Sequence, residues 1–210
     1  MFKRVKDEEK SKRRSGIFWS IFLGAFCILY FVFFGKVVIG KAISFEEAAN
    51  DGTLKRDQYA YVDVKCVLED YATTQHTINF IPSGTDEHFL IVLENGDILP
   101  VKVSNKKTRV ALSEIRRVSF KDGQCKTEKE ITPVRIKGMV FSIAPDIERS
   151  MERAVERRGL FDNDRTVYYC ELDCTWGPGK AGGVLVALLL VEAVLVYSTI
   201  DDIRKKKRGN

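Results

Sequence analysis

The pattern of apolar and polar positions divides the chain into two continuous apolar stretches and a region of alternating patterns between them. Residues 17–34 carry no charged side chain over 18 positions. Residues 184–200 are apolar over 17 positions apart from Glu192 and a short polar end. At 1.5 Å per residue, about 20 helical residues cross a hydrocarbon core of about 30 Å. The pattern therefore predicts transmembrane helices over residues 17–39 and 181–200.

Each apolar stretch has a competing interpretation. A basic start followed by an apolar run is also typical of a secretory signal peptide, but this run is longer than usual, rich in Phe, and lacks an evident small-x-small cleavage site. The competing interpretation of the second stretch is a buried helix of a soluble core. Against it, the stretch is apolar on all sides and is followed after three residues by residues 204–208, Arg-Lys-Lys-Lys-Arg. We favour membrane spans in both cases.

The region between the stretches, residues 40–180, is predicted to be one domain in which several segments alternate with a period of two. Asn95-Gly96 between two such segments predicts a tight hairpin turn. Pro100 predicts an edge strand or a bulge for its segment, and Gly138 predicts a bulge. Strands are expected at residues 59–68, 74–81 (ended by Pro82), 88–93, 97–103, 131–143 and 165–173. Helices are expected at residues 45–50 behind a Ser44 cap, 108–118 and 145–159.

These elements predict the α+β class. Mostly hairpin-connected strands with two interspersed helices favour an antiparallel β-rich domain, and its most specific form would be a small OB-like barrel, as in oligonucleotide/oligosaccharide-binding folds. The predicted architecture is therefore two transmembrane helices flanking one α+β domain.

The net charge of +5 changes this picture once it is divided along the chain. Residues 1–16 hold seven basic and three acidic side chains, and residues 201–210 hold five and two, so the tails together carry +7. The remainder has a net charge of −2 and no overall positive field for phosphates, so we expect no nucleic-acid partner. Lys and Arg beside membrane spans favour the cytoplasmic side. Both basic tails are therefore predicted to be cytoplasmic and the domain extracytoplasmic, in the cell membrane.

Glu192 is the most unusual residue of the apolar stretches, because a carboxylate in the middle of a span is costly unless it is neutral, paired or turned inward. It is a candidate proton or cation site, or a polar contact to a partner's transmembrane helix. The simpler interpretation is a protonated Glu192 that hydrogen-bonds to Tyr30 or to a nearby backbone group. Gly16, Ser20 and Gly24 form a small-residue stripe that would let the two spans touch.

Four of the five cysteines lie in the domain: Cys66, Cys125, Cys170 and Cys174. An even number in an exported domain permits two disulfides with three connectivities. Cys170 and Cys174 on one strand would be about 13 Å apart, too far to bridge each other, so we expect each to pair with Cys66 or Cys125. Free buried thiols and a zinc site are the alternatives, and the Cys-x3-Cys spacing argues against zinc.

The layout of the whole chain resembles that of small uncharacterised two-span membrane proteins of Gram-positive bacteria. The resemblance rests on the basic tail, the Phe-rich span, a single domain, a second span and the Lys-Lys-Lys-Arg end, residues 205–208. It implies a cell-membrane location and carries over no site residues. It also implies an envelope with little disulfide machinery.

No Gly-x-Ser-x-Gly, P-loop or His-Glu-x-x-His motif is present, and the two histidines, His76 and His88, stand apart in the sequence. We therefore expect no catalytic residues, no cofactor and no metal. The leading hypothesis is a non-enzymatic membrane protein in the lipid bilayer whose domain binds another membrane or envelope protein, or an envelope component, as an accessory subunit. The alternatives are a membrane-anchored enzyme without a recognisable motif, and a small transport-associated protein that uses Glu192.

Overall fold

The computed structural model describes residues 2–121, 124–125, 131–159 and 165–208. The chain forms two compact units. One unit consists of the two terminal segments, up to Ile39 and from Pro178 onward, and the other is the domain between them, residues 40–177. Each unit is described separately below.

The terminal unit is a pair of long antiparallel helices, α1 (Phe2–Ile39) and α5 (Pro178–Arg208). Both contain a segment long and apolar enough to cross a membrane, Ser15–Ile39 and Pro178–Lys205. Gly16 lies where an added Cβ would be 3.1 Å from the Thr199 hydroxyl. Such close approach is what small residues permit between helices, and it brings α1 and α5 side by side.

The domain is built on a seven-stranded mixed sheet with the order β1-β2-β8-β9-β5-β4-β3. The β1–β2 and β5–β9 pairs are parallel and the other pairs are antiparallel. The strands are β1 (Ile43–Ser44), β2 (Tyr59–Val64), β3 (Cys66–Ile78), β4 (Ile81–Val92), β5 (Ile98–Val103), β8 (Val134–Ser142) and β9 (Cys170–Asp173). Two further short strands, β6 (Phe120–Lys121) and β7 (Gln124–Cys125), form a separate two-stranded sheet.

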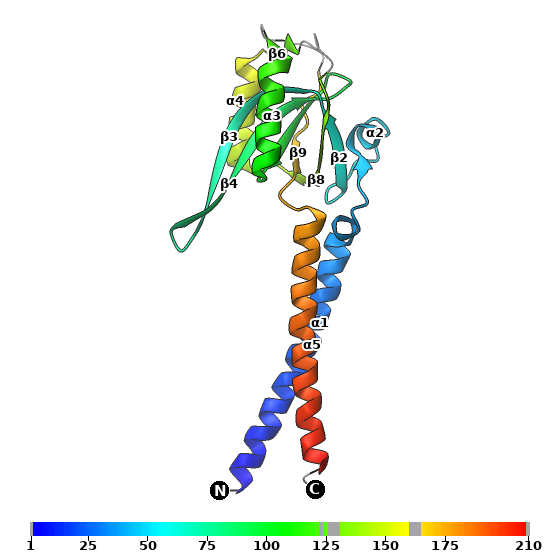
Figure 1. The fold of residues 1–210 in the computed structure, drawn as a ribbon, viewed down its shortest axis with the longest axis vertical. Helices are drawn as coiled ribbons and strands as arrows, with labels where there is room; N and C mark the ends of the chain where they lie inside the picture. Colours follow the sequence, from blue (N-terminus) through cyan, green and yellow to red (C-terminus); the bar gives the residue numbers. More distant parts are fainter. Residues whose placement is uncertain (1, 122–123, 126–130, 160–164, 209–210) are drawn as a thin grey trace. The chain divides into compact units, whose positions relative to one another are not determined.

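Helices α3 (Lys106–Ser119) and α4 (Pro145–Arg157) cover opposite faces of this sheet (Figure 1). Each buries one apolar side and leaves its charged side in solvent, as expected for amphipathic surface helices. The short helix α2 (Phe45–Asn50) begins at Ser44, whose hydroxyl accepts a hydrogen bond from the Glu47 amide at 3.3 Å.

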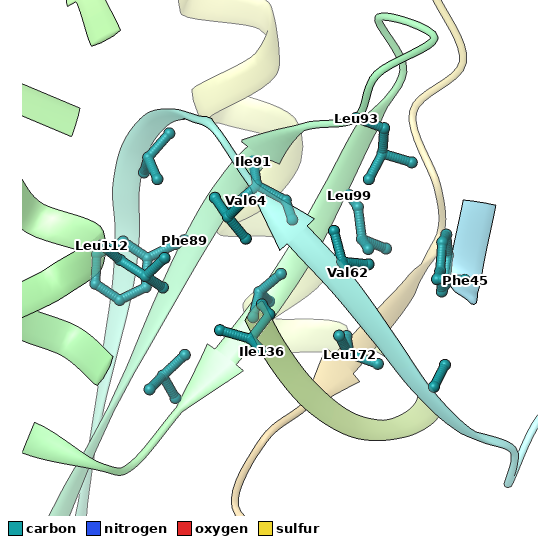
Figure 2. Close-up of a cluster of buried hydrophobic side chains, with 14 of the residues drawn as sticks. Phe45, Val62, Val64, Phe89, Ile91, Leu93, Leu99, Leu112, Ile136 and Leu172 are labelled. Carbon is teal, nitrogen blue, oxygen red and sulfur yellow. The ribbon is translucent and has the colours of Figure 1, made fainter. Parts of the chain in front are cut away.

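The larger core lies between the sheet and α3, and Figure 2 shows its central side chains. Alternate residues of one strand supply it, for example Phe89 and Ile91 of β4, while Leu112 of α3 packs against them. The intervening residue Leu90 faces the other side, where it packs with Met151 of α4 in the smaller core. The period of two along β4 therefore decides which helix each residue meets.

The sheet is open, so the expected OB-like barrel is wrong. Only Lys65 separates β2 from β3 in the chain, yet these strands lie at or near opposite ends of the strand order. Within the described residues no ladder joins β2 to β3, so the sheet does not close. The α+β class is confirmed, but the sheet expected to be antiparallel is mixed, because β1 runs parallel to β2 and β9, between β8 and β5, runs parallel to β5.

Several local expectations also differ from the structure. The predicted strand at residues 59–68 breaks at Lys65, and the one predicted to stop before Pro82 instead forms part of a long hairpin, β3–β4, with its turn at Asn79-Phe80. Pro100 lies in an interior strand opposite Leu90. Its nitrogen faces β9 in a gap of that ladder, so no pairing donor is lost.

Gly138 forms no bulge but pairs regularly with Ala60. Its role is to permit close approach, since an added Cβ would lie 2.5 Å from the Asp173 carbonyl oxygen. The Asn95-Gly96 hairpin is confirmed, with Val92 opposite Ile98 and Gly96 at φ 90°.

Candidate functional site

Helix α3 is strongly basic in an otherwise acidic domain. Residues 40–177 contain 20 basic and 23 acidic side chains, whereas α3 alone carries five basic side chains and one acidic one. Positions 106, 109, 113 and 117 share one helix face, at intervals of three or four residues. The sequence analysis identified a rough helix here but did not single out this concentration of charge.

A shallow hollow of about 430 Å³ lies along this face of α3. Its lining consists of Glu87, Lys106, Arg109, Val110, Ser113, Glu114 and Arg117. Arg109 donates from Nη1 to Glu87 at 2.8 Å, but its buried Nε atom has no hydrogen-bond partner within the described residues. In that same part of the chain, Lys106 and Arg117 have no ion-pair partner. The hollow thus combines unneutralised cations with the exposed Val110, a mixture suited to an anionic group attached to an apolar body.

A second group of charged residues is buried on the face of the sheet covered by α4. Asp86 of β4, with a side chain only 4% exposed, lies at its centre. Lys102 Nζ is 3.4 Å from an Asp86 oxygen and 3.2 Å from an Asp173 oxygen. Ser104 donates a hydrogen bond to Asp86, and His76 Nε2 lies 2.7 Å from its second oxygen. His76 belongs to β3, Lys102 to β5, and Ser104 lies just beyond β5, so Asp86 of β4 ties three strands together. Lys102 extends the group to Asp173 of β9.

His88 continues this group toward the interior. Its Nδ1 atom is 3.3 Å from Glu171 Oε2 and its Nε2 atom is 3.2 Å from the Thr74 hydroxyl. The Tyr71 ring lies 5.9 Å from the imidazole, and the Tyr71 hydroxyl is buried without a hydrogen-bond partner in the described part of the chain. We call His76, Asp86, His88, Lys102, Ser104, Glu171 and Asp173 the polar cluster.

The electrostatics of the polar cluster favour fixed charges. Burial raises the pKa of Asp86, but the hydrogen bonds from Ser104 and His76 and the Lys102 charge outweigh it, so the pKa lies below its ordinary value. Burial lowers the pKa of Lys102, but the Asp173 carboxylate and other acids outweigh it, so the pKa is raised. A carboxylate and an ammonium held ionised in this way suit an ionic clamp better than proton transfer near neutral pH.

The polar cluster also lacks the connectivity of a nucleophilic triad. In such a triad the hydroxyl contacts the histidine, and the carboxylate orients the histidine from its other nitrogen. Here the Ser104 hydroxyl and His76 both contact Asp86. The sequence analysis treated both histidines as isolated, whereas each contacts a carboxylate. The signal that would have found them is a polar residue at every second position of an apolar strand, as at Asp86 and His88 before Leu90.

Glu192 faces α1 within the helix pair. An added Cβ at Gly24 would lie 3.7 Å from Glu192 Oε1, and Glu192 Oε2 is buried without a hydrogen-bond partner among the described residues. Tyr30 does not contact Glu192, because its hydroxyl donates to the Ala181 carbonyl at 3.0 Å, eleven residues away along α5. The expected Glu192–Tyr30 hydrogen bond is therefore absent from the structure.

The cysteines differ from the expected pairing. Cys66 is disulfide-bonded, whereas Cys170 and Cys174 are free thiols. Burial raises the pKa of both free thiols, so they are poor nucleophiles. Cys170 and Cys174 therefore do not form the expected disulfides with Cys66 or Cys125. The side chain of Cys125 lies outside the residues whose side chains the structure describes. Among the described residues, no three His, Cys, Asp or Glu side chains are arranged to hold a metal ion.

Residues 177–182 match the Gly-x-Gly-x-x-Gly spacing of dinucleotide-binding loops. In those proteins the loop joins a strand to a helix that leads to a second parallel strand. Here α5 leads to no further strand in the described part of the chain. The match therefore lacks the strand-helix-strand context in which this spacing indicates a dinucleotide-binding loop.

Comparison with known proteins identifies no relative. No protein-family model, no curated protein and no solved structure matches the chain. The functional argument therefore rests on the residues themselves.

Proposed function

We propose that the chain is a two-span membrane protein, with both termini in the cytoplasm, whose extracytoplasmic domain binds an acidic partner through α3. The partner is a membrane or envelope protein, or an anionic envelope component, and the chain acts as an accessory subunit without catalysis. The observation that carries the proposal is the hollow on α3, where Lys106 and Arg117, without ion-pair partners among the described residues, flank exposed Val110.

The two terminal helices support the membrane placement. None of the most apolar window of α5 is buried, and only 11% of that of α1, so neither resembles the core helix of a soluble protein. Side chains such as Leu190 and Val194 are more than half exposed, which is costly in water and favourable in lipid. The Tyr30–Ala181 hydrogen bond argues against a cleaved signal peptide, since cleavage would remove a partner of α5.

The charge distribution supports an acidic partner. A domain with three more acids than bases has a helix with a net charge of +4, so the positive field is local. Complementary charge accelerates association and selects partners, and apolar contacts at the centre of an interface supply most of the affinity. The α3 surface offers both on one helix face.

The enzyme alternative has one favourable observation, the contact of both histidines with carboxylates in the polar cluster. Neither the α3 hollow nor a second hollow of about 490 Å³ beside Tyr71 is lined by these histidines. The transport alternative rests on the buried Oε2 atom of Glu192, which has no hydrogen-bond partner in the part of the chain that the structure describes. Glu192→Gln and Glu192→Leu separate its roles, because a structural contact tolerates Gln, whereas an ionisable site tolerates neither.

The test is a double charge reversal, Lys106→Glu with Arg117→Glu, in the full chain purified from its native membrane in a mild detergent. The matched control is Arg149→Glu with Arg153→Glu on the exposed side of α4. A photo-crosslinking residue at position 110 reports what occupies the hollow. We expect one stoichiometric acidic partner crosslinked at position 110, lost on reversal in α3 and retained on reversal in α4. Equal loss in both variants, or no partner at position 110, would contradict the proposal.

A further inference from the structure

The β3–β4 hairpin extends well past the rest of the sheet (Figure 1). The ladder between β4 and β5 begins at Glu87, which lies opposite Val103. From there residues 73–86 of β3 and β4 continue as a two-stranded ribbon, paired to Ile78 opposite Ile81. We call residues 73–85 the arm.

The tip of the arm is apolar and fully accessible. Phe80 is 100% exposed, and Ile78 and Ile81 are each about two-thirds exposed. The tip turn, Asn79-Phe80, has φ values of 50° and 65°. Turns of this kind favour Gly at such positions, and a bulky residue there is strained. A strained, solvent-exposed Phe contributes nothing to the core, so a function explains its position better than stability does.

The arm also lacks charge. Residues 71–85 contain no Asp, Glu, Lys or Arg, in a chain of which 30% is charged. His76 is the only titratable side chain of the arm itself apart from Tyr71 at its base, and it contacts Asp86. Edge ribbons that must stay in water usually carry charges, in particular Lys. An uncharged ribbon that ends in Ile and Phe is suited to an apolar environment.

The pairing register shows which way the arm points within the domain. One rung of the sheet joins His88 of β4 to Lys102, Lys102 to Asp173 of β9, and Asp173 to Met139 and Tyr59. The arm and the residues after β9 leave the sheet on the same side of this rung, whereas the residues before β1 lie on the other side. The chain therefore leaves the domain at Gly177 from the end of the sheet at which the arm projects.

The arm is longer than the segment that connects β9 to α5. From His88 to Phe80 there are eight residues, about 26 Å at 3.3 Å per residue. From Asp173, on the same rung, to Gly177 there are four residues, at most about 14 Å of extended chain. Because α1 ends at Ile39 and α5 begins at Pro178, no linker separates the domain from either apolar helix in the sequence. The polar cluster holds the base of the arm through Asp86, so the arm is braced against β5 and β9.

From these observations we infer that the tip of the arm, Ile78, Phe80 and Ile81, inserts into the lipid bilayer surface and forms a third point of contact with the membrane. The inference rests on the membrane placement proposed above but not on the acidic partner. Apolar and aromatic side chains at the tip would be buried among headgroups and the first acyl carbons, as in other interfacial anchors.

The test places the photo-crosslinker p-benzoylphenylalanine at position 80 of the full chain in phospholipid nanodiscs, followed by mass spectrometry of the adducts. Position 94 is the matched control, since Glu94 is exposed in the other turn of β4 at the opposite end of the sheet. Position 26 is the positive control, since Phe26 is exposed within the apolar stretch of α1. We expect phospholipid adducts at positions 80 and 26 and none at position 94.

The outcomes separate the two proposals. Lipid adducts at position 26 but not at position 80, or protein adducts at position 80, overturn the inference and leave the membrane placement intact. Absence of lipid adducts at position 26 overturns the membrane placement itself, and the inference falls with it. As a further check, Ile78→Ser with Ile81→Ser should lower the yield of lipid adduct at position 80 several-fold. An unchanged yield would mean that the tip does not insert.

Discussion

Strand β4 begins and ends in turns that use the left-handed backbone region in different ways. At its end, Gly96 takes φ 90° without a side chain, and the Leu93 amide closes the turn onto Asp97. At its beginning, Phe80 takes φ 65° with an aromatic side chain entirely in solvent. The first turn follows the preferences that make hairpins fold, and the second departs from them.

The difference indicates that the Asn95-Gly96 turn is suited to stability, whereas the Asn79-Phe80 turn meets another requirement. Glu94, Asn95 and Asp97 surround the first turn with polar groups, and the Asn95 side chain contacts Asp97. The second turn keeps one polar residue, Asn79, and is otherwise formed by Ile78, Phe80 and Ile81. Local rules are most often broken at functional sites, which is why the arm carries our inference about the bilayer.

The largest expected effect lies at the base of the arm. Asp86→Ala removes the partner of Lys102, Ser104 and His76 and leaves buried polar groups unpaired, so we expect a loss of about 2–4 kcal/mol. Asp86→Asn keeps the volume and the Ser104 hydrogen bond and should lose less. Thermal unfolding of the purified full chain measures both. Equal, small losses would mean that the polar cluster does not brace the arm.

Low pH should remove the stability that ionised Asp86 contributes at the base of the arm. The folded state holds the pKa of Asp86 below its ordinary value of 3.8, so the ionised form contributes stability above that value. This contribution is lost as pH falls through the lowered folded pKa. The wild-type chain should therefore lose thermal stability more steeply below about pH 4 than Asp86→Asn, which lacks this titration. If the thermal stability of the two proteins falls equally with pH, Asp86 does not contribute stability through its ionised form.

A smaller loss is expected at the turn that follows the usual rules. Gly96→Ala places a Cβ in the left-handed region, which costs about 1 kcal/mol although the site has open space around it. Gly177→Ala is the control, because Gly177 also has open space but no left-handed φ. Unfolding midpoints of the two variants should differ. If they coincide, backbone strain does not distinguish this turn.

The smallest effect has the opposite sign. Phe80→Gly relieves a left-handed Phe and removes no contact within the domain, so it should stabilise the folded domain by about 0.5 kcal/mol after the added freedom of the unfolded chain is counted. Hydrogen exchange of the arm amides in mild detergent measures this. Destabilisation by Phe80→Gly would show that Phe80 supports the fold, and the contrast between the two turns would then fail.

Sequence reasoning found the features that local pattern encodes. The Asn95-Gly96 turn, helix α3 and helix α4 follow from turn chemistry and periodicity. The tip turn was missed because Asn79-Phe80 contains neither Gly nor Pro, and Pro82 next to it indicated the end of a strand. The sheet order was missed because β9 pairs with β5 across about 70 residues, which no local pattern specifies.

The polar cluster was missed for a related reason. Asp86, Lys102 and Asp173 come from three strands, and only the register brings them together. The α3 hollow required the three-dimensional structure as well, because ion pairing decides which cations stay unneutralised. Arg116 and Arg117 are neighbours in the sequence, yet Arg116 pairs with Asp70 and Arg117 has no ion-pair partner among the described residues.

The most direct test of the central claim is labelling of intact cells with a membrane-impermeant maleimide. Single cysteines are placed at position 94 in the domain and at positions 11 and 210 in the tails, in a background with all five native cysteines replaced by Ala. The account predicts labelling at position 94 in intact cells and labelling of the tails only after permeabilisation. Labelling of either tail in intact cells, with position 94 protected, would contradict the two-span arrangement with an external domain.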